Sequence, residues 1–308
     1  MLLLLTVLVG GGAASLVLGW FLLQAFVQSK FSQDTVQEFL LRASAGPVAH
    51  RAGQPENTLA GFRLCKDQGA SGVEVDLMFS QDGHPVLIHD ETVDRTSNGT
   101  GRVCELTLEQ LKSLDVGFKA GSEFAGERIP TLYEALDVCK ELNLLMFLEL
   151  KEDAEKSAAL IKTLFSRDPS LYNMVAIISF HQSIIHKLQR MDPKLLLGLV
   201  YRSGYDAYSV TGRRKHSSLM KHLLYVLYDA LLEWSLKTWL WRVLGISLLV
   251  VHKNDILGKI FPTGMWERRD VCVVGWTVND REEKRLFESE LRIPYFTDHV
   301  SNTDHVSN

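Results

Sequence analysis

The sequence lacks closely spaced cysteines. Its 308 residues include four cysteines, and no two of them form a Cys-x-x-Cys pair. A zinc cluster of cysteines and a disulfide-stapled scaffold are therefore excluded, and we expect the thiols to be buried and unbridged. The sequence also lacks a basic excess, because its formal net charge is −4. Since phosphate backbones favour a basic protein face, nucleic acid is not expected as the main partner.

Charge is missing from the N-terminus, where residues 2–29 contain no ionisable side chain. As a helix this stretch would reach about 42 Å, against a bilayer hydrocarbon core of about 30 Å. A cleaved signal peptide is the alternative, but a basic first region is missing and the apolar run resumes at Leu16. We expect residues 1–29 to be a transmembrane anchor, followed by a linker at 30–46. Lys30 alone is too little basic charge to orient this anchor.

The rest of the chain alternates short apolar runs with amphipathic stretches. Runs rich in Val, Ile and Leu without alternation are typical of strands buried on both faces of a parallel sheet. Such strands, separated by helices over about 250 residues, predict a (β/α)8 TIM barrel at 47–302. A doubly wound open sheet is the alternative, but no Gly-rich phosphate loop follows the first strand. The expected strands are Pro47–Ala49, Gly72–Leu77, Leu144–Leu150, Met174–Ser179, Leu195–Val200, Ser247–Val251, Val271–Trp276 and Tyr295–Thr297.

The connection between Asp76 and Leu144 is too long for one crossover helix. It contains a strand-like piece at Val86–His89 and a helical piece at Leu108–Leu114. Long connections inside compact domains are usually functional or disordered. We therefore expect an insertion after strand two that lies over the barrel mouth.

A second irregular segment, Leu219–Val251, is apolar and holds three of the six tryptophans. Its charged residues Asp229, Glu233 and Lys237 recur every four residues and therefore share one helical face. A spanning helix would bury all three at a cost of several kcal/mol, so spanning is disfavoured. A membrane-contacting interfacial helix at 219–246 would keep these charges in water while Leu, Tyr and Trp side chains enter the headgroup region. An ordinary barrel helix followed by its strand is an equal alternative.

The C-terminus contains the hexapeptide Thr-Asp-His-Val-Ser-Asn twice, at 297–302 and 303–308. The first copy can end the last strand. The second copy is expected to be a polar tail, and we assign the duplication no function.

Glu74 and Asp76 are the first candidates for a site. Residues two apart in a strand face the same way, with Cα atoms about 6.6 Å apart, so both carboxylates can converge on one ion. Buried carboxylates need such compensation, although one of them could simply cap a loop. Glu149 follows the apolar run 144–148 and shares a face with Lys151, at a strand end where barrel active sites lie, although the two could form only a salt bridge. Three hard oxygen ligands favour Mg²⁺ or Ca²⁺ over zinc.

Two histidines lie at the ends of expected strands. His50 follows the first strand and precedes Arg51, whereas His89 ends an apolar run. Imidazoles titrate near neutral pH and suit general acid–base catalysis. A single histidine is more often structural, but two of them beside three carboxylates favour a catalytic role. Arg51 and Lys151 could hold phosphate oxygens, the former as a planar fork and the latter as a point charge.

Several motifs, in order from about Pro47 to Asp298, resemble the glycerophosphodiester phosphodiesterase family. The anchor and the Trp-rich segment are most similar to the membrane-interacting member that acts on glycerophosphoinositol. Ala52 departs from the pattern, because many relatives have glycine there; we expect it to be tolerated if its backbone dihedrals are ordinary. The motifs are Ala49–Gly53, Pro55–Thr58, Glu74–Asp76, Pro85–Asp90, Ile129–Leu132, Glu149–Lys151 and Gly275–Asn279.

The resemblance implies a TIM barrel with an insertion after strand two. It implies metal-dependent hydrolysis of glycerophosphodiesters, such as glycerophosphoinositol, to glycerol 3-phosphate and an alcohol. It leaves open which histidine is the acid and which the base. The implied metal ligands are Glu74, Asp76 and Glu149. The implied acid–base pair is His50 and His89. The implied substrate contacts are Arg51, Lys151 and Trp276.

Two other functions use the same residues differently. Lysophospholipase D activity on lysophospholipids or N-acyl glycerophosphoethanolamines would use the same site, with the apolar segment as a lip at the barrel mouth. A membrane interaction protein that has lost activity is disfavoured, because every motif residue needed for chemistry is present. The sequon Asn98-Gly99-Thr100 predicts glycosylation at Asn98 and hence a lumenal or extracellular barrel.

Overall fold

The computed structural model of the protein describes residues 33–301, except 152 and 210. The expected anchor at 1–29 and the tail at 303–308 lie outside the described residues. Within the described ranges, no helix combines the length and the apolar character needed to cross a bilayer.

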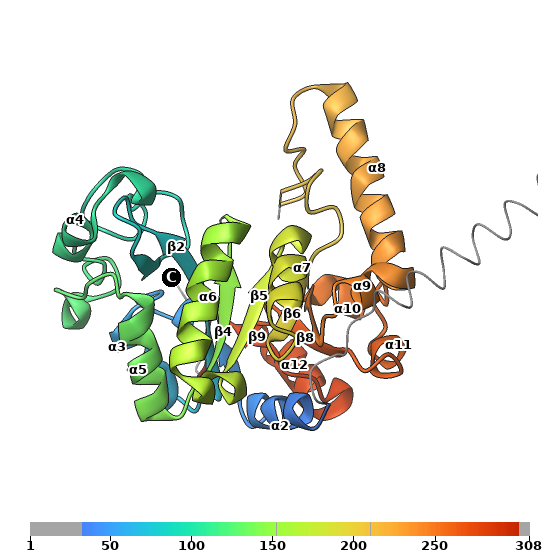
Figure 1. Ribbon diagram of the computed structural model, residues 1–308, viewed down its shortest axis with the longest axis horizontal. Coiled ribbons are helices and arrows are strands. Elements are labelled where there is room, and N and C mark those ends of the chain that lie inside the picture. Colours follow the sequence, from blue (N-terminus) through green and yellow to red (C-terminus); the bar gives the residue numbers. More distant parts are fainter. Residues whose placement is uncertain (1–32, 152, 210, 302–308) are drawn as a thin grey trace, which may run out of the picture.

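Eight parallel strands form a nearly closed barrel with helices around it (Figure 1). The strand order is β8-β7-β6-β5-β4-β2-β1-β9, and a parallel bridge between Gly275 and Tyr295 joins the two ends. The TIM barrel predicted from the sequence is therefore confirmed, and each strand overlaps the run expected for it. The strands are β1 (Val48–Ala49), β2 (Gly72–Phe79), β4 (Leu145–Leu150), β5 (Val175–Ser179), β6 (Leu196–Tyr201), β7 (Leu248–His252), β8 (Cys272–Trp276) and β9 (Phe296–Thr297).

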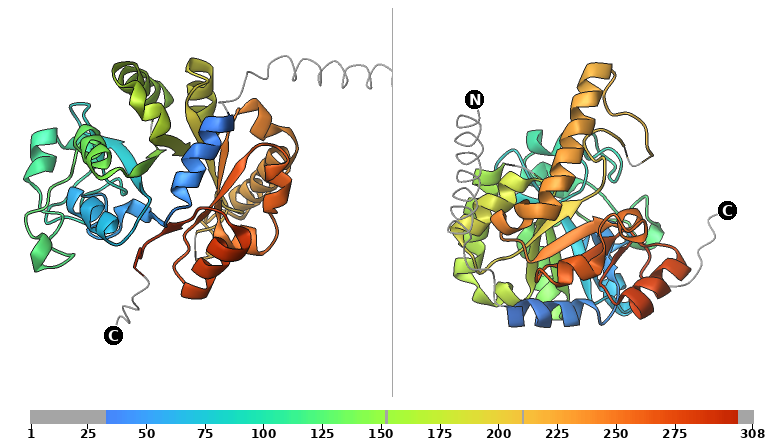
Figure 2. Two further views of the ribbon diagram at one scale, coloured as in Figure 1. Left: turned by 90° about the horizontal axis from the view of Figure 1, so that it is seen from below. Right: turned by 90° about the vertical axis from the view of Figure 1, so that its right-hand side faces the viewer.

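Helices cover the outer face of the barrel (Figure 2). They bury the strand side chains that point outward. Because these strands are covered on one side by helices and on the other by the barrel interior, nearly all of their residues are buried. The helices are α3 (Leu59–Asp67), α5 (Leu132–Leu142), α6 (Ala154–Arg167), α7 (Gln182–Met191), α8 (Leu219–Ser235), α9 (Trp241–Val243), α10 (Lys253–Leu257), α11 (Thr263–Glu267) and α12 (Arg281–Arg285).

The helix α2 (Gln33–Ala43), within the expected linker, closes one end of the barrel (Figure 2). Its Phe39 ring packs edge-on against Phe147 of β4, with centroids 5.3 Å apart. Phe147 in turn contacts Phe296 of β9 across the interior, at 5.0 Å. The barrel interior is thus filled with apolar side chains at this end, which leaves the site residues to the opposite end.

The expected insertion lies between β2 and α5. It contains β3 (Pro85–Leu87), which pairs antiparallel with the end of β2, and α4 (Leu108–Ser113). The insertion has a small apolar core of its own, with Val103 and Leu111 fully buried. Its residues Glu91, Arg102 and Cys104 line the cavity at the barrel mouth, so the predicted position beside the mouth is confirmed.

The apolar segment 219–246 forms α8, a π-helical turn at Leu236–Leu240 and α9, and then leads into β7. The interfacial-helix alternative places all three recurring charges in water, but Asp229 is buried, whereas the side chains of Glu233 and Lys237 are 31% and 29% exposed. Asp229 is only 8% exposed and accepts hydrogen bonds from the backbone N–H groups of Asp206 and Ala207. The charged face of α8 packs on the loop that precedes it, because these backbone donors need acceptors.

The cysteines form no disulfide within the described residues. Cys65 and Cys139 are buried as expected. Cys104 is exposed, so the expectation of burial is wrong there, because the insertion places it at the edge of a cavity.

Candidate active site

A cavity of about 550 Å³ opens at the carboxyl ends of the barrel strands. Barrel active sites form at this end, from residues at strand ends and in the following loops. The cavity brings together the residues expected to hold a metal, to exchange protons and to contact substrate. These are His50, Arg51, Glu74, Asp76, His89, Glu149, Lys151 and Trp276.

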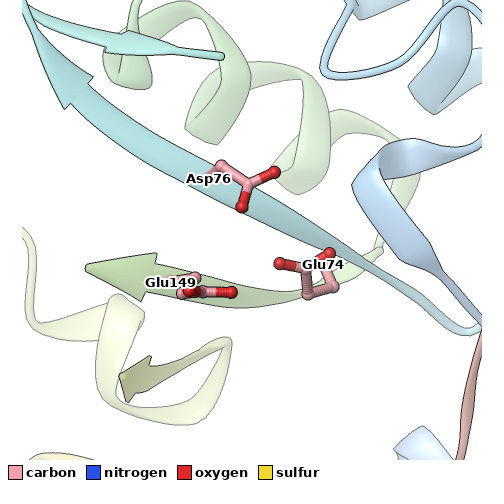
Figure 3. Close-up of side chains that lie close together, drawn as sticks. All are labelled: Glu74, Asp76 and Glu149. Atoms are coloured by element: carbon pink, nitrogen blue, oxygen red, sulfur yellow. The ribbon is translucent and has the colours of Figure 1, made fainter. Parts of the chain in front are cut away.

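Three carboxylates meet on one side of this cavity (Figure 3). Glu74 and Asp76 share a face of β2, and the parallel register places Asp76 directly beside Glu149 of β4. One oxygen from each carboxylate lies within 4.8 Å of the others. Oxygen donors at this spacing could hold a divalent cation such as Mg²⁺ or Ca²⁺.

Burial perturbs the charges of this cluster. Burial, followed by the negative charge of Asp76, raises the pKa of Glu74 to about 7. Burial also raises the pKa of Glu149 to about 8, against the opposing charge of Lys151. Burial acts on Asp76 in the same direction, but the charges of Lys151 and His89 and the hydrogen bonds from Lys151 and Asn57 together outweigh it and lower the pKa of Asp76. The cluster therefore favours a cation that replaces protons on two of its carboxylates.

Asp76 has several direct partners. Lys151 Nζ lies 2.8 Å from Asp76 Oδ1, and Asn57 Nδ2 donates to Asp76 Oδ2 at 3.0 Å. Arg51 Nε is 3.9 Å from the same Oδ2 atom. Lys151 therefore forms its ion pair with Asp76 on β2. The alternative interpretation, a salt bridge between Lys151 and Glu149, is not what the structure shows.

His50 is held by a carboxylate from the other end of the chain. Its Nδ1 donates to Asp298 Oδ1 at 2.6 Å, while its Nε2 lies 3.8 Å from Glu74 Oε2. Asn279 Nδ2 donates to the second oxygen of Asp298 at 2.6 Å. Burial lowers the pKa of His50, but the bond to Asp298 and the charge of Glu74 outweigh this and raise it. The result is an imidazole fixed with its Nε2 towards the metal site.

His89 has a similar carboxylate partner nearby. Its Nδ1 donates to Asp90 Oδ1 at 2.6 Å. Arg95 donates from Nε to Asp90 and from both terminal nitrogens to Glu56. The bond from Arg95 holds the pKa of Asp90 well below its usual range, and burial lowers the pKa of His89. Each imidazole therefore has its Nδ1 occupied by a carboxylate and its other nitrogen free to face substrate.

The loop after β1 has an unusual backbone. Arg51 and Ala52 have φ values of 51° and 58°, in the left-handed region. This conformation directs the Arg51 N–H to Glu74 Oε2, at 2.9 Å. The backbone dihedrals at Ala52 are therefore not ordinary, contrary to the condition for tolerating alanine there. Ala52 adopts a conformation that favours glycine. Such strain is typical of functional sites, where neighbouring contacts hold the backbone in place.

Aromatic rings form the wall of the cavity opposite the insertion. Phe180 stacks on Tyr205 with centroids 4.2 Å apart, and Trp276 meets Phe180 edge-on at 5.6 Å. The buried Trp276 Nε1 has no hydrogen-bond partner among the described residues. We refer to these three rings as the aromatic wall.

Several of these residues were missed by reasoning from the sequence. Asp90 was visible beside His89, and Asn57 lay within a recognised motif, but neither had been given a role. Asp298 belongs to the first copy of the hexapeptide, to which no function had been assigned. Phe180 and Tyr205 carried no signal, because single aromatic residues after strands are common in any barrel.

The fold and cavity define a (β/α)8 barrel whose mouth holds two imidazoles and an acidic cluster that could bind a cation. The profile of the family described as "Glycerophosphoryl diester phosphodiesterase family" matches residues 49–302. The chain is 38% identical to "Glycerophosphodiester phosphodiesterase 1" of Mus musculus over 276 residues, 87% of this chain and 82% of the mouse protein. The human protein of the same name is 38% identical over 256 residues, 82% of this chain and 77% of the human protein.

Solved structures support the same assignment of the fold. A phosphodiesterase from Oleispira antarctica, in complex with the product sn-glycerol-3-phosphate, superposes with a TM-score of 0.62 at 24% identity, covering 86% of this chain and 96% of that one. A glycerophosphodiester phosphodiesterase from Agrobacterium tumefaciens gives 0.61 at 23% identity, covering 83% and 96%. The chain belongs to the glycerophosphoryl diester phosphodiesterase family and is a glycerophosphodiester phosphodiesterase.

Proposed function

We propose that this enzyme carries out metal-dependent hydrolysis of glycerophosphoinositol and similar glycerophosphodiesters to glycerol 3-phosphate and an alcohol. The observation that carries the proposal is the convergence of three carboxylates, two imidazoles and two cationic side chains on one cavity. Glu74, Asp76 and Glu149 would hold the cation, Mg²⁺ or Ca²⁺. When bound, such an ion neutralises charge on the phosphoryl oxygens and lowers the barrier to attack.

The two histidines would move the protons of the reaction. One imidazole would take the proton of the attacking oxygen as that oxygen bonds to phosphorus. Attack by water gives glycerol 3-phosphate directly, whereas attack by the adjacent glycerol hydroxyl gives a cyclic phosphate, which a water molecule then opens to glycerol 3-phosphate. The other imidazole gives a proton to the leaving alcohol oxygen as the second phosphorus–oxygen bond breaks. Asp298 and Asp90 orient His50 and His89 for these transfers through the 2.6 Å bonds to Nδ1.

The cationic side chains would bind the phosphate. Lys151 Nζ and the Arg51 guanidinium both line the cavity beside the carboxylates. The ion pair with Asp76 partly neutralises Lys151 and fixes the position of its Nζ. Lys151 would therefore orient the phosphate as well as attract it.

The aromatic wall would receive the alcohol part of the substrate. A polyol ring such as inositol can lay its C–H face against Phe180 and Tyr205. The unpartnered Trp276 N–H would donate to one of its hydroxyl groups, because a buried donor gains free energy by finding an acceptor. This arrangement supports a polyol leaving group over a small apolar alcohol.

A second candidate function is lysophospholipase D activity on lysophospholipids or N-acyl glycerophosphoethanolamines. One observation favours it. A smaller cavity of about 90 Å³ shares Phe180 and Tyr205 with the catalytic cavity and reaches Tyr228 and Leu232 on α8. An acyl chain could lie along this path while the phosphate occupies the metal site.

A substrate panel separates the two candidates. Purified enzyme, stripped with a chelator and reloaded with Mg²⁺ or Ca²⁺, is assayed on glycerophosphoinositol, glycerophosphocholine and lysophosphatidylinositol. We expect glycerophosphoinositol to give the largest kcat/KM, and Trp276→Phe to raise its KM by several-fold, as expected for one lost hydrogen bond. A larger kcat/KM on lysophosphatidylinositol would establish the second candidate, and unchanged activity in chelator would overturn the metal requirement.

We also propose that residues 1–29 anchor the enzyme in a membrane with the barrel on the lumenal or extracellular side. The apolar N-terminal sequence and the Asn98 sequon support this topology. Asn98 is exposed in the insertion, and its side-chain Oδ1 accepts from the Asp115 N–H at 2.9 Å. A gel-mobility shift after glycosidase treatment, absent in Asn98→Gln, tests the proposal; an unglycosylated Asn98 removes its support.

A further inference from the structure

One face of α8 is apolar and open to solvent. Eight large side chains recur along it at spacings of one and three residues, which places them on one half of the helix circumference. Their exposed fractions lie between 45% and 69%. They are Leu219, Met220, Leu223, Leu224, Leu227, Tyr228, Leu231 and Trp234.

The opposite face of α8 carries the polar and charged groups, and the protein fixes it in place. His222 and Asp229 are buried there. Asp229 accepts from two backbone N–H groups of the preceding loop, and Glu233 Oε2 accepts from the Tyr201 hydroxyl at 3.2 Å. The helix therefore cannot rotate to bury its leucines without breaking these bonds. A helix on a water-facing surface normally buries its apolar face and exposes its polar face, and α8 does the opposite.

The exposed charges of this segment have one sign. Within 211–240, the exposed charged side chains are Arg213, Arg214 and Lys215, in the loop before α8, and Lys221 in its first turn. The acidic residues of that range are Asp229 and Glu233, and both face the protein. An exposed apolar helix face in a segment whose exposed charges are all basic is typical of helices that lie in the interface of an anionic bilayer.

The position of α8 makes this face accessible. Figure 1 and the right-hand view of Figure 2 show α8, in orange, projecting beyond the rest of the barrel. Its 17 residues span about 25 Å, and no described helix is able to cross a bilayer. A second copy of the same face offers no exposed acid to the four basic residues, whereas anionic lipid headgroups do.

We propose that α8 docks in the plane of an anionic lipid bilayer, with Leu223, Leu227 and Trp234 entering the headgroup region. Arg213, Arg214 and Lys221 then contact lipid phosphates and carboxylates. Because the small cavity beside α8 shares Phe180 and Tyr205 with the catalytic cavity, docking places the barrel mouth close to the membrane surface. The proposal goes beyond the hydrolytic function and does not depend on which phosphodiester is cleaved.

Tryptophan quenching tests this docking directly. Full-length enzyme is reconstituted into vesicles of phosphatidylcholine and phosphatidylserine, in which the phosphatidylcholine is brominated on its acyl chains near the headgroup. We expect wild type to lose a larger fraction of its emission than Trp234→Phe, because bromine quenches only indoles that reach lipid. The comparison with Trp234→Phe subtracts quenching of the other tryptophans, including Trp20.

Two further variants identify the forces. Leu223→Glu with Leu227→Glu should abolish the Trp234-dependent quenching, and Arg213→Gln with Arg214→Gln should remove its dependence on phosphatidylserine. Hydrolysis of a soluble glycerophosphodiester by each variant shows that the barrel is folded. Equal quenching in wild type and Trp234→Phe overturns the proposal. A wild-type dimer that Leu227→Glu converts to a monomer, without Trp234 quenching, makes this face a contact between two copies instead.

Discussion

The carboxylate cluster of Glu74, Asp76 and Glu149 and the helix α8 both place charge towards the interior, but the two regions compensate that charge in different ways. The cluster gathers three carboxylates in the interior and surrounds them with Lys151, Arg51 and two imidazoles. In α8 the charged residues also face inward, but they bind backbone groups, and the apolar residues face out. Charge buried in the cluster raises two carboxyl pKa values and creates a need for a cation. The charge buried under α8 is compensated by hydrogen bonds. What remains uncompensated there is the apolar surface of the outward-facing side chains, which is exposed to water.

The largest effect should come from removing one carboxylate of the cluster. Glu74→Gln keeps the shape of the side chain and removes a metal ligand, so we expect kcat/KM to fall on the order of 10³-fold or more. Calorimetric titration should show the loss of divalent cation binding. In the presence of chelator the variant should unfold at the same temperature as wild type or higher, because a buried carboxyl with a raised pKa no longer has to be accommodated.

Glu141→Gln is the matched control. Its side chain is 65% exposed on α5, so activity and cation binding should stay at wild-type values. Full activity of Glu74→Gln would show that the cluster is not the reaction centre.

A smaller effect is expected from the residue that orients His50. Asp298→Asn removes the charge that accepts from Nδ1, and we expect kcat to fall about 10–100-fold with little change in KM. Asp270→Asn, an exposed residue with the same chemical change, serves as the control. A loss of stability without a selective change in kcat would indicate that Asp298 only ties β9 to the barrel.

The pH dependence of cation binding should follow the raised carboxyl pKa values. Glu74 and Glu149, with pKa values of about 7 and about 8, stay protonated in the folded protein where the unfolded chain has released these protons. Stability without a cation should therefore fall as pH rises from about 4.5 to about 8. A cation must displace the same protons, so its affinity should rise about tenfold per pH unit over the upper part of this window.

Thermal unfolding with and without Mg²⁺ at several pH values measures both trends. The increase in Tm produced by Mg²⁺ should grow as pH rises towards 8. An increase in Tm that is independent of pH would show that the cation binds elsewhere.

The smallest effect concerns the inward face of α8. Asp229→Ala leaves the N–H groups of Asp206 and Ala207 without acceptors, and we expect a loss of about 1–3 kcal/mol in the free energy of unfolding. Leu227→Glu on the outward face should change this free energy by less than about 0.5 kcal/mol in detergent-free solution. Urea denaturation of both variants measures the contrast, and equal destabilisation would mean that Leu227 is packed against the protein.

Much of the barrel could be predicted from the sequence because a parallel strand covered on both faces is a continuous apolar run. Glu74, Asp76 and Glu149 could be grouped because two-residue periodicity and strand ends are local properties of the chain. Their ion pairs could not be assigned in this way. Two-residue periodicity allows a salt bridge between Lys151 and Glu149 as one alternative, but the parallel register places Asp76 within reach of Lys151.

The sequence by itself determined the strands, the insertion after strand two, and the three carboxylates that meet at the barrel mouth. These follow from patterns over a few neighbouring residues. Only the tertiary structure decided that Asp298 holds His50, a contact between residues 248 positions apart, and that Asp229 faces inward. A helical pattern shows which residues share a face but not which face meets the protein. That choice depends on backbone donors in the preceding loop, which become neighbours of the helix only when the barrel has closed.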